Sequence, residues 1–207
     1  MNGSESLIKT LVNSGIEVCF TNPGTSEMHF VAALDEVDGM RCVLGLFEGA
    51  VSGAADGYAR MTGKPAATLL HLGPGLGNAL ANIHNAKKGH SPMINIVGDH
   101  ATYHLEYDAP LTADIEGIAG PVSHWVHTSE SAATVGKDAA EAVQAAKQAP
   151  GQIVSLILPS DTAWNEGGVA HAAVEPTAPA PFAKDMLAQA AEALSGPDSL
   201  LLLGGAA

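Results

Sequence analysis

Residues 66–88 read AATLLHLGPGLGNALANIHNAKK, and this stretch decides the fold class. Its first residues form a compact apolar run with the length of a buried strand, and a glycine-rich turn leads into a helical window at 75–88. A buried strand that passes through a short turn into a helix is the unit from which parallel sheets are assembled. The stretch therefore predicts one strand and its crossover helix in an α/β protein.

The same unit recurs along the chain. Further strands are predicted at 16–20, 41–46, 93–98 and 153–158, and further helices at 26–37, 48–61 and 131–148, after a first helix that ends before Gly15. This alternation predicts an α/β fold with an open parallel sheet and helices on both faces. Ligands of such sheets bind beyond the carboxyl ends of the strands, so we expect the chemistry in the loops at 21–26, 47–49, 72–78 and 99–114.

Composition and charge argue against nucleic acid and membranes as partners of this chain. The chain has 207 residues, of which 46% are apolar, and 22 acidic against 9 basic residues give a net charge of −13. Such a surface has no basic stripe for nucleic acid. No apolar stretch reaches the about 20 residues that a membrane helix needs, and the first residues lack the parts of a signal peptide. We expect a cytoplasmic protein without a membrane or nucleic-acid partner, whose Cys19 and Cys42 are reduced and buried in strands.

A change of pattern after Pro159 predicts two domains. We place the first domain at 1–166 and a linker at 167–181, where glycines and prolines gather. Residues 182–207 hold one helical window and an apolar run at 199–203, and they predict the truncated start of a second α/β domain. Because that last run has no partner strand left, we expect the sequence to be a piece of a longer protein.

Glu48 is the first candidate for chemistry. It is the only charged residue between Arg41 and Asp56, and it stands where a predicted strand passes into a helix rich in alanine and glycine. A poorly solvated carboxylate in such a place suits proton exchange with a ligand nitrogen near neutral pH. The alternative is an ordinary glutamate on a first helical turn, where the helix dipole favours negative charge.

The glycine turn at 72–78 and His71 before it form a second candidate. Glycines between a strand and a helix let the backbone approach a ligand at the helix N-terminus, as in dinucleotide sites. However, Asn78 stands where the dinucleotide fingerprint has its third glycine, and the turn follows the third strand rather than the first. His71 is either a proton-transfer group or a histidine bonded to nearby backbone.

Taken together, several separated motifs resemble one family. They are Asn22-Pro23-Gly24, Glu48-Gly49-Ala50, the run from Ala55 to Arg60 with Gly63-Lys64-Pro65, Gly73-Pro74-Gly75 with Asn78-Ala79, and Pro159-Ser160-Asp161. Their order and spacing resemble the N-terminal, pyrimidine-binding domain of thiamine-diphosphate-dependent enzymes, in particular acetolactate synthases and benzoylformate decarboxylases. The resemblance covers residues 3–165.

The resemblance implies an enzyme that acts on 2-keto acids. In this family the glutamate that matches Glu48 hydrogen-bonds N1′ of the aminopyrimidine and so promotes removal of the thiazolium C2 proton, and the cofactor serves as electron sink when carbon dioxide leaves. The resemblance further implies a homodimer or homotetramer with active sites between subunits. By position it assigns cofactor contacts to Asn22, Pro23, Gly24, Glu48, Gly73 and Asn78, substrate contacts to Thr25 and His71, and catalytic roles to Glu48 and His71.

Metal and flavin are expected outside this stretch. The magnesium ion that accompanies the cofactor in this family is held by a later domain, whose Gly-Asp-Gly signature is missing here. His100 and His104 with Glu106 and Asp108 have no recognisable ligand spacing, so no metal site is predicted in this chain. FAD stays an open alternative for the middle domain, and the 207-residue piece alone is expected to be inactive.

Two departures from the family pattern bear on the substrate. Pro110-Leu111-Thr112 precedes Ala113-Asp114 where acetolactate synthases commonly carry Phe-Gln-Glu, and Leu70-His71 stands where they usually carry small hydroxyl residues. The histidine resembles the decarboxylase side of the family. We expect acetolactate synthase-like decarboxylation or carboligation, with a benzoylformate decarboxylase-type activity as the alternative. A dinucleotide-binding domain and a non-catalytic binding partner are the alternatives from other classes.

Overall fold

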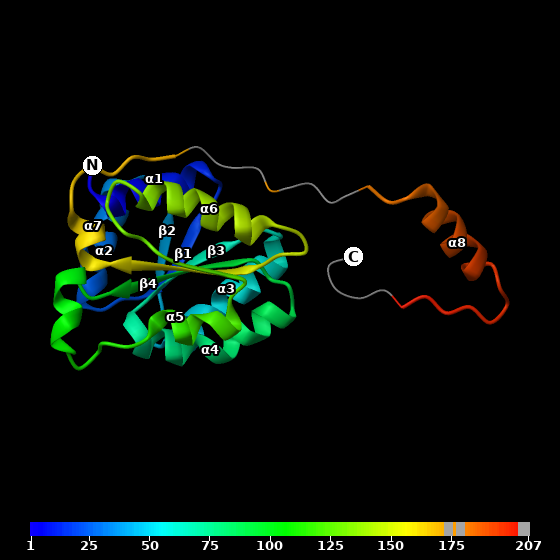
Figure 1. The fold of residues 1–207 in the computed structure, drawn as a ribbon, viewed down its shortest axis with the longest axis horizontal. Coiled ribbons are helices and arrows are strands. Elements are labelled where there is room, and N and C mark those ends of the chain that lie inside the picture. The colour runs from blue at the N-terminus through cyan, green and yellow to red at the C-terminus, as the bar shows by residue number, and fades with distance from the viewer. Residues whose placement is uncertain (172–175, 177–180, 203–207) are drawn as a thin grey trace. The chain divides into compact units, whose positions relative to one another are not determined.

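In the described part of the chain, six parallel strands form one sheet in the order β2-β1-β3-β4-β6-β5 (Figure 1). The structure is a computed structural model that describes residues 1–171, 176 and 181–202. The strands are β1 (Val18–Asn22), β2 (Arg41–Leu44), β3 (Ala66–Leu70), β4 (Met93–Asp99), β5 (Trp125–Thr128) and β6 (Ile153–Pro159). The predicted open parallel sheet is confirmed.

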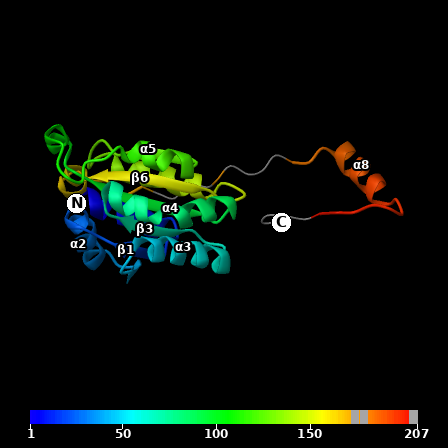
Figure 2. The same ribbon diagram turned by 90° about the horizontal axis from the view of Figure 1, so that it is seen from below.

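Helices cover both faces of this sheet, as Figures 1 and 2 show. One face carries α1 (Gly3–Asn13), α2 (Met28–Glu36), α6 (Val135–Lys147) and the short α7 (Ser160–Trp164); the other carries α3 (Glu48–Thr62), α4 (Leu72–Lys88) and α5 (Ile115–Ala119). Each layer encloses its own apolar core, with Phe30 buried in the first and Leu72 in the second. Three single-turn or short 3₁₀ helices connect these elements: η1 (Thr25–Glu27), η2 (Thr102–Tyr107) and η3 (Gly120–Val122).

The strand register brings distant loops to one edge. β1 lies between β2 and β3, with Asn22 paired to Leu70, and β4 continues the series with Val97 paired to Leu70. Since all strands are parallel, the loops after β1, β3 and β4 leave the sheet at the same edge. The sheet therefore gathers residues that are far apart in sequence beyond its carboxyl ends.

Two expectations about strands are wrong. Cys19 is buried, but Cys42 is exposed, because β2 is the edge strand of the sheet and most of its residues face solvent. Residues 199–202 form no strand, and residue 203 lies outside the described residues. A strand needs a hydrogen-bonded neighbour, and 199–202 have none here. In addition, β5 was not predicted: its sequence, WVHT, is short and half-buried, without an apolar run.

Contacts divide the chain into Met1–Pro176 and Thr177–Ala207. The second unit contains α8 (Lys184–Leu194), in which Met186, Leu187 and Leu194 are exposed. The predicted limits of 1–166, 167–181 and 182–207 for a domain, a linker and a second domain stay predictions.

Candidate active site

Glu48 is the first residue of α3, directly after the turn that leaves β2. Its side chain is only 9% exposed, and its Oε2 accepts a hydrogen bond of 3.0 Å from Nδ2 of Asn78 on α4. Its Oε1 faces Gly75, where an alanine Cβ would lie 3.3 Å away. The carboxylate is thus held by one oxygen, and the other oxygen borders a position without a side chain.

The two helices that carry this pair are fastened to each other one turn further on. The hydroxyl of Ser52 donates to the carbonyl of Glu48 at 2.9 Å and lies 3.2 Å from the carbonyl of Ala79. Nδ2 of Asn82 donates to the carbonyl of Gly49 at 2.6 Å. These bonds fix the start of α3 against α4, so the geometry of Glu48 does not depend on its own side-chain rotamer alone.

His71 precedes α4 as its N-cap residue and is partly buried. The next residue, Leu72, has a φ of 50°, a left-handed backbone conformation that is unfavourable for leucine. Its side chain is fully buried in the core, and this packing holds the backbone in that conformation. Strain of this kind persists where the surrounding packing enforces it and gathers at functional sites. The turn therefore holds His71 in a fixed place at the end of β3.

Glu27 is the partner of His71, and sequence reasoning missed it. Oε2 of Glu27 lies 2.8 Å from Nδ1 of His71 and accepts the backbone N–H of Gly24 at 2.7 Å. The residue is 1% exposed, and burial raises the pKa of its carboxyl, while the Gly24 N–H and His71 oppose that rise. The available signal was its position: Glu27 directly follows the loop at 21–26, which was already expected to carry chemistry.

Close backbone approaches complete the cluster. Gly24 packs on the ring of His71, and a Cβ atom at that position would collide with the ring. Gly73 packs on Ala113, which ends the loop after β4, and a Cβ atom there would also collide. Gly75 lies between Glu48 and His71, because an alanine Cβ there would be 3.4 Å from Cβ of His71 as well as near Glu48.

The structure brings most of the predicted site residues to this edge. Asn22 ends β1, Pro23 and Gly24 follow in the loop after it, and Thr25 begins η1 and is exposed. Asn78 is exposed and bonds to Glu48, so the partner of its amide is the carboxylate. Across the described residues, no three His, Cys, Asp or Glu side chains come together in a way that could hold a metal ion.

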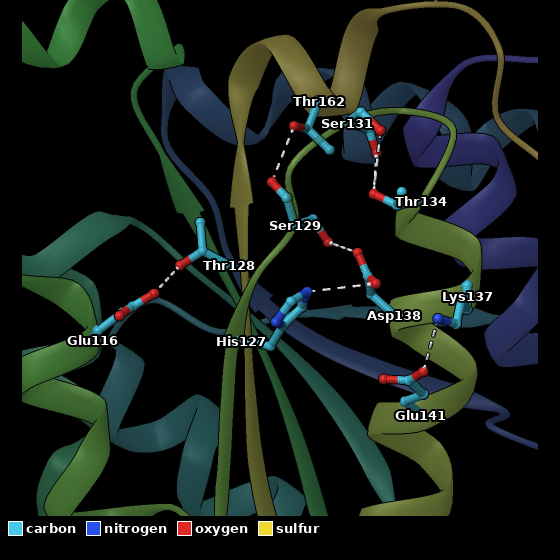
Figure 3. A network of polar contacts seen from close by, with 10 residues as sticks. All are labelled: Glu116, His127, Thr128, Ser129, Ser131, Thr134, Lys137, Asp138, Glu141 and Thr162. Carbon is cyan, nitrogen blue, oxygen red and sulfur yellow. Dashed lines mark hydrogen bonds and ion pairs between the residues drawn. The ribbon is translucent and has the colours of Figure 1, made fainter.

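A second polar network lies on β5 and α6 (Figure 3). Nε2 of His127 is 3.4 Å from Oδ1 of Asp138, and the buried hydroxyl of Ser129 donates to Oδ2 of the same carboxylate at 2.8 Å. Thr162 at α7 donates to the carbonyl of Ser129 at 3.3 Å. In this network the aspartate stands between the serine and the histidine, so the histidine does not contact the serine as a nucleophile pair requires.

The geometry around Glu48 suits proton exchange with a ring nitrogen of a bound ligand. A ring nitrogen that shares a proton with a carboxylate needs an oxygen that no protein group already binds, and Oε1 of Glu48, beside Gly75, accepts no hydrogen bond from the described residues. The fold and the site together define an α/β domain whose two buried acids and one histidine lie at the carboxyl ends of β1, β2 and β3.

Comparisons with known proteins agree with this class. A family model described as "Thiamine pyrophosphate enzyme, N-terminal TPP binding domain" matches residues 1–128. The chain belongs to this family; thiamine pyrophosphate and thiamine diphosphate are the same compound. Within the described residues, no helix is both long and apolar enough to cross a membrane.

Individual relatives come from both branches that the motifs resemble. The chain is 58% identical over 206 residues to "Putative acetolactate synthase large subunit IlvX" of Mycobacterium tuberculosis, which covers 99% of this chain and 39% of the relative. It is 34% identical over 196 residues to benzoylformate decarboxylase of Pseudomonas aeruginosa, over 92% of this chain and 37% of that one. The chain therefore spans about two fifths of the relatives that it matches.

A solved structure supports the fold independently. The thiamine diphosphate-dependent 4-hydroxybenzoylformate decarboxylase of Rhodococcus jostii RHA1 superposes with a TM-score of 0.83 at 28% identity, over 94% of this chain and 37% of that one. The sheet and the two helical layers described above are thus the fold of a known thiamine-diphosphate enzyme.

Proposed function

We propose that the whole protein catalyses thiamine-diphosphate-dependent decarboxylation or carboligation of a 2-keto acid, and that this chain provides the pyrimidine half of the cofactor site. The observation that carries the proposal is the carboxylate of Glu48, buried at the start of α3, held through Oε2 by Asn78 and open through Oε1 beside Gly75. That arrangement suits a glutamate that exchanges a proton with N1′ of an aminopyrimidine ring.

The other residues take roles that follow from their places. Asn22, Pro23, Gly24 and Gly73 would line the pyrimidine ring, Asn78 would orient Glu48, and Thr25 and His71 would face the keto acid. When bound, the cofactor supplies a carbon nucleophile for the keto group and an electron sink for the electrons left by carbon dioxide. The protein's own part is to place these groups, to exchange a proton at Glu48, and to exchange a second proton at His71.

Between the two branches, one observation favours a decarboxylase. His71 is bonded to a buried carboxylate, which is the environment of a histidine used for proton transfer rather than for packing. Acetolactate synthase-like carboligation is the other candidate, favoured by the relative with 58% identity. Product analysis with pyruvate and with benzoylformate separates an acyloin product from an aldehyde.

Further proposals concern the surroundings of the chain. We place the magnesium ion and the diphosphate outside it, because the described residues contain no cluster of metal ligands. A homodimer or homotetramer and a cytoplasmic location stay proposals, the latter supported by two free thiols, Cys19 and Cys42, since disulfides are the mark of oxidising compartments. FAD in a middle domain also stays a proposal.

The test is Glu48→Gln in the full-length protein. The amide cannot supply the proton-sharing carboxylate, so we expect turnover of the keto acid to fall by more than about a hundredfold while the protein stays folded. Glu5→Gln, the same change in the first turn of α1, is the matched control and should keep full turnover. Near-normal turnover of Glu48→Gln with thiamine diphosphate required would contradict the role of Glu48.

The rival classes make different predictions. A dinucleotide-binding protein would bind NAD or a flavin tightly and ignore thiamine diphosphate and magnesium, and calorimetry distinguishes these ligands. A non-catalytic relative would bind the cofactor or a partner but show no keto acid consumption in wild type. Either result would replace the proposed function.

A further inference from the structure

One oxygen atom joins two parts of the site. Oε2 of Glu27 accepts the backbone N–H of Gly24 at 2.7 Å and lies 2.8 Å from Nδ1 of His71. Gly24 belongs to the loop after β1, and His71 directly follows β3, the neighbouring strand. Because Gly24 also packs flat on the imidazole, the ring has one carboxylate at its Nδ1 edge and one backbone unit on its face.

The other oxygen of Glu27 is isolated. Oε1 is buried and has no hydrogen-bond partner among the described residues. It packs against Gly98 near the end of β4, where any Cβ atom would collide with it. Among the described residues, the carboxyl group of Glu27 therefore bonds to its neighbours only through Oε2.

The direction of the hydrogen bond between Glu27 and His71 follows from the carboxylate and from its second partner, the N–H of Gly24. An ionised carboxylate only accepts hydrogen bonds, so Oε2 accepts from the N–H of Gly24, and the hydrogen atom shared with His71 must then come from Nδ1. An Oε2 that accepts from Gly24 is best completed by a second donor, which requires a hydrogen atom on Nδ1 of His71. Burial raises the pKa of Glu27, but the N–H of Gly24 and His71 both oppose that rise and so favour the ionised form that accepts from Nδ1.

We propose that Glu27 is a positioning residue that keeps the proton of the neutral His71 ring on Nδ1 and so leaves Nε2 as the atom that exchanges a proton with the substrate. This inference rests on the proposed function, because it assigns the reacting atom of a residue in that site. A carboxylate that holds the hydrogen atom on one ring nitrogen of a histidine determines whether the other nitrogen accepts or donates a proton at the substrate.

The first test reads the nitrogen atoms directly. In the 207-residue chain labelled with ¹⁵N-histidine, the His71 signals are identified by their loss in His71→Gln. In wild type we expect the neutral His71 ring to carry its hydrogen atom on Nδ1, with Nε2 unprotonated. Glu27→Gln should keep this pattern, because the amide oxygen still accepts at the place of Oε2, whereas Glu27→Leu should shift hydrogen toward Nε2.

A second histidine–carboxylate pair provides the matched control. Asp138→Asn alters the partner of His127 in the network of Figure 3, which shares no residue with the Glu27 cluster. This variant should leave the His71 signals unchanged. Hydrogen on Nε2 of His71 in wild type would overturn the proposal, and so would a Glu27→Leu protein with the wild-type pattern. If Glu27→Leu does not fold, the wild-type signals still decide.

The second test measures turnover in the full-length enzyme. Glu27→Leu should lower kcat by about tenfold to a hundredfold, less than the about 10²–10⁴-fold expected for the loss of an acid–base group itself, with thiamine diphosphate affinity within about threefold. Glu27→Gln should recover most of that loss, which a purely electrostatic role of the charge would not allow. Equal losses in Glu27→Gln and Glu27→Leu would overturn the positioning role.

The two tests keep this inference apart from the proposed function. A full-length protein without any keto acid turnover would refute the function, whereas the nitrogen signals decide the tautomer of His71 in either case. A protein that turns over keto acids normally with Leu at position 27 would refute the inference and leave the function standing.

Discussion

Nδ2 of Asn78 lies 3.0 Å from Oε2 of Glu48 and joins α4 to the first residue of α3. The bond leaves a single carboxylate oxygen, Oε1, to face the glycine turn. Since the two helices are also fastened through Ser52 and Asn82, the carboxylate has a defined direction before any ligand arrives. Preorganisation of this kind lowers the free energy needed to bring a catalytic group into place.

Removal of the amide should misdirect Glu48. We expect Asn78→Ala in the full-length enzyme to lower kcat by about tenfold to a hundredfold, the scale of one lost hydrogen bond to a charged group. Asn82→Ala is the matched control, because Asn82 lies one turn further along α4 and bonds to the carbonyl of Gly49 instead of the carboxylate. Steady-state kinetics and cofactor calorimetry on both variants measure the effect; equal losses in the two would mean that only the helix contact matters.

A methyl group at Gly75 should separate activity from stability. It would lie 3.3 Å from Oε1 of Glu48 and 3.4 Å from Cβ of His71, so both must move by a few tenths of an ångström. Alanine also favours a helix over glycine by about 0.5–1 kcal/mol. We expect Gly75→Ala to keep or raise the melting temperature while kcat falls by about tenfold.

Gly77→Ala on the same helix is the control for this prediction. Nothing in the chain lies within 4 Å of its added methyl group. This variant should gain the same helix stabilisation and keep its turnover. A Gly75→Ala enzyme that matches Gly77→Ala in both measurements would show that the space beside Glu48 is not needed.

Truncation of His71 should act on rate rather than on cofactor binding. We expect His71→Ala to lower kcat by about 10²–10⁴-fold with nearly unchanged affinity for thiamine diphosphate. It also leaves Glu27 without one of its two hydrogen-bond donors, so a loss of about 1–3 kcal/mol of stability should accompany the kinetic effect. Single-turnover rates and melting temperature are measured on the same preparation. An unchanged rate with a lower melting temperature would assign His71 a purely structural role.

Acid should destabilise the fold through His124. Its Nδ1 accepts the backbone N–H of Ile153 at 3.0 Å, and although the residue is exposed, partial desolvation of the ring, followed by the positive charge of Lys87, lowers its pKa from its usual value. A histidine whose pKa is lower in the folded state stabilises the fold above the pKa of the unfolded chain, and that stability is lost as the pH falls. We expect the wild-type melting temperature to fall between pH 7.5 and pH 5.5, and to fall less in His124→Gln.

The same substitution at the exposed His84 provides the comparison for His124. His84→Gln should retain the wild-type loss of stability over this pH range. If His124→Gln and wild type lose stability to the same extent, groups other than His124 govern the acid response.

Much of this protein was determined by its sequence. The apolar runs that became β1, β3, β4 and β6 and the alternation with helices were sufficient for the open parallel sheet, because strand and helix period are local properties of the chain. Glu48 and the glycine turn were recognisable for the same reason: both stand at a junction of two predicted elements, where parallel sheets place their ligands.

Only the tertiary structure decided which residues meet. Glu27 and His71 are far apart in sequence, and they touch because β1 pairs with β3 and brings the ends of both strands together. Strand order also makes β2 and β5 the edges of the sheet. Cys42 is exposed because it lies on an edge strand, and β5 is a strand because it pairs with β6. Local patterning specifies the period of each element, but the order of strands is selected by the packing of all of them at once, and that order creates the bond between Glu27 and His71.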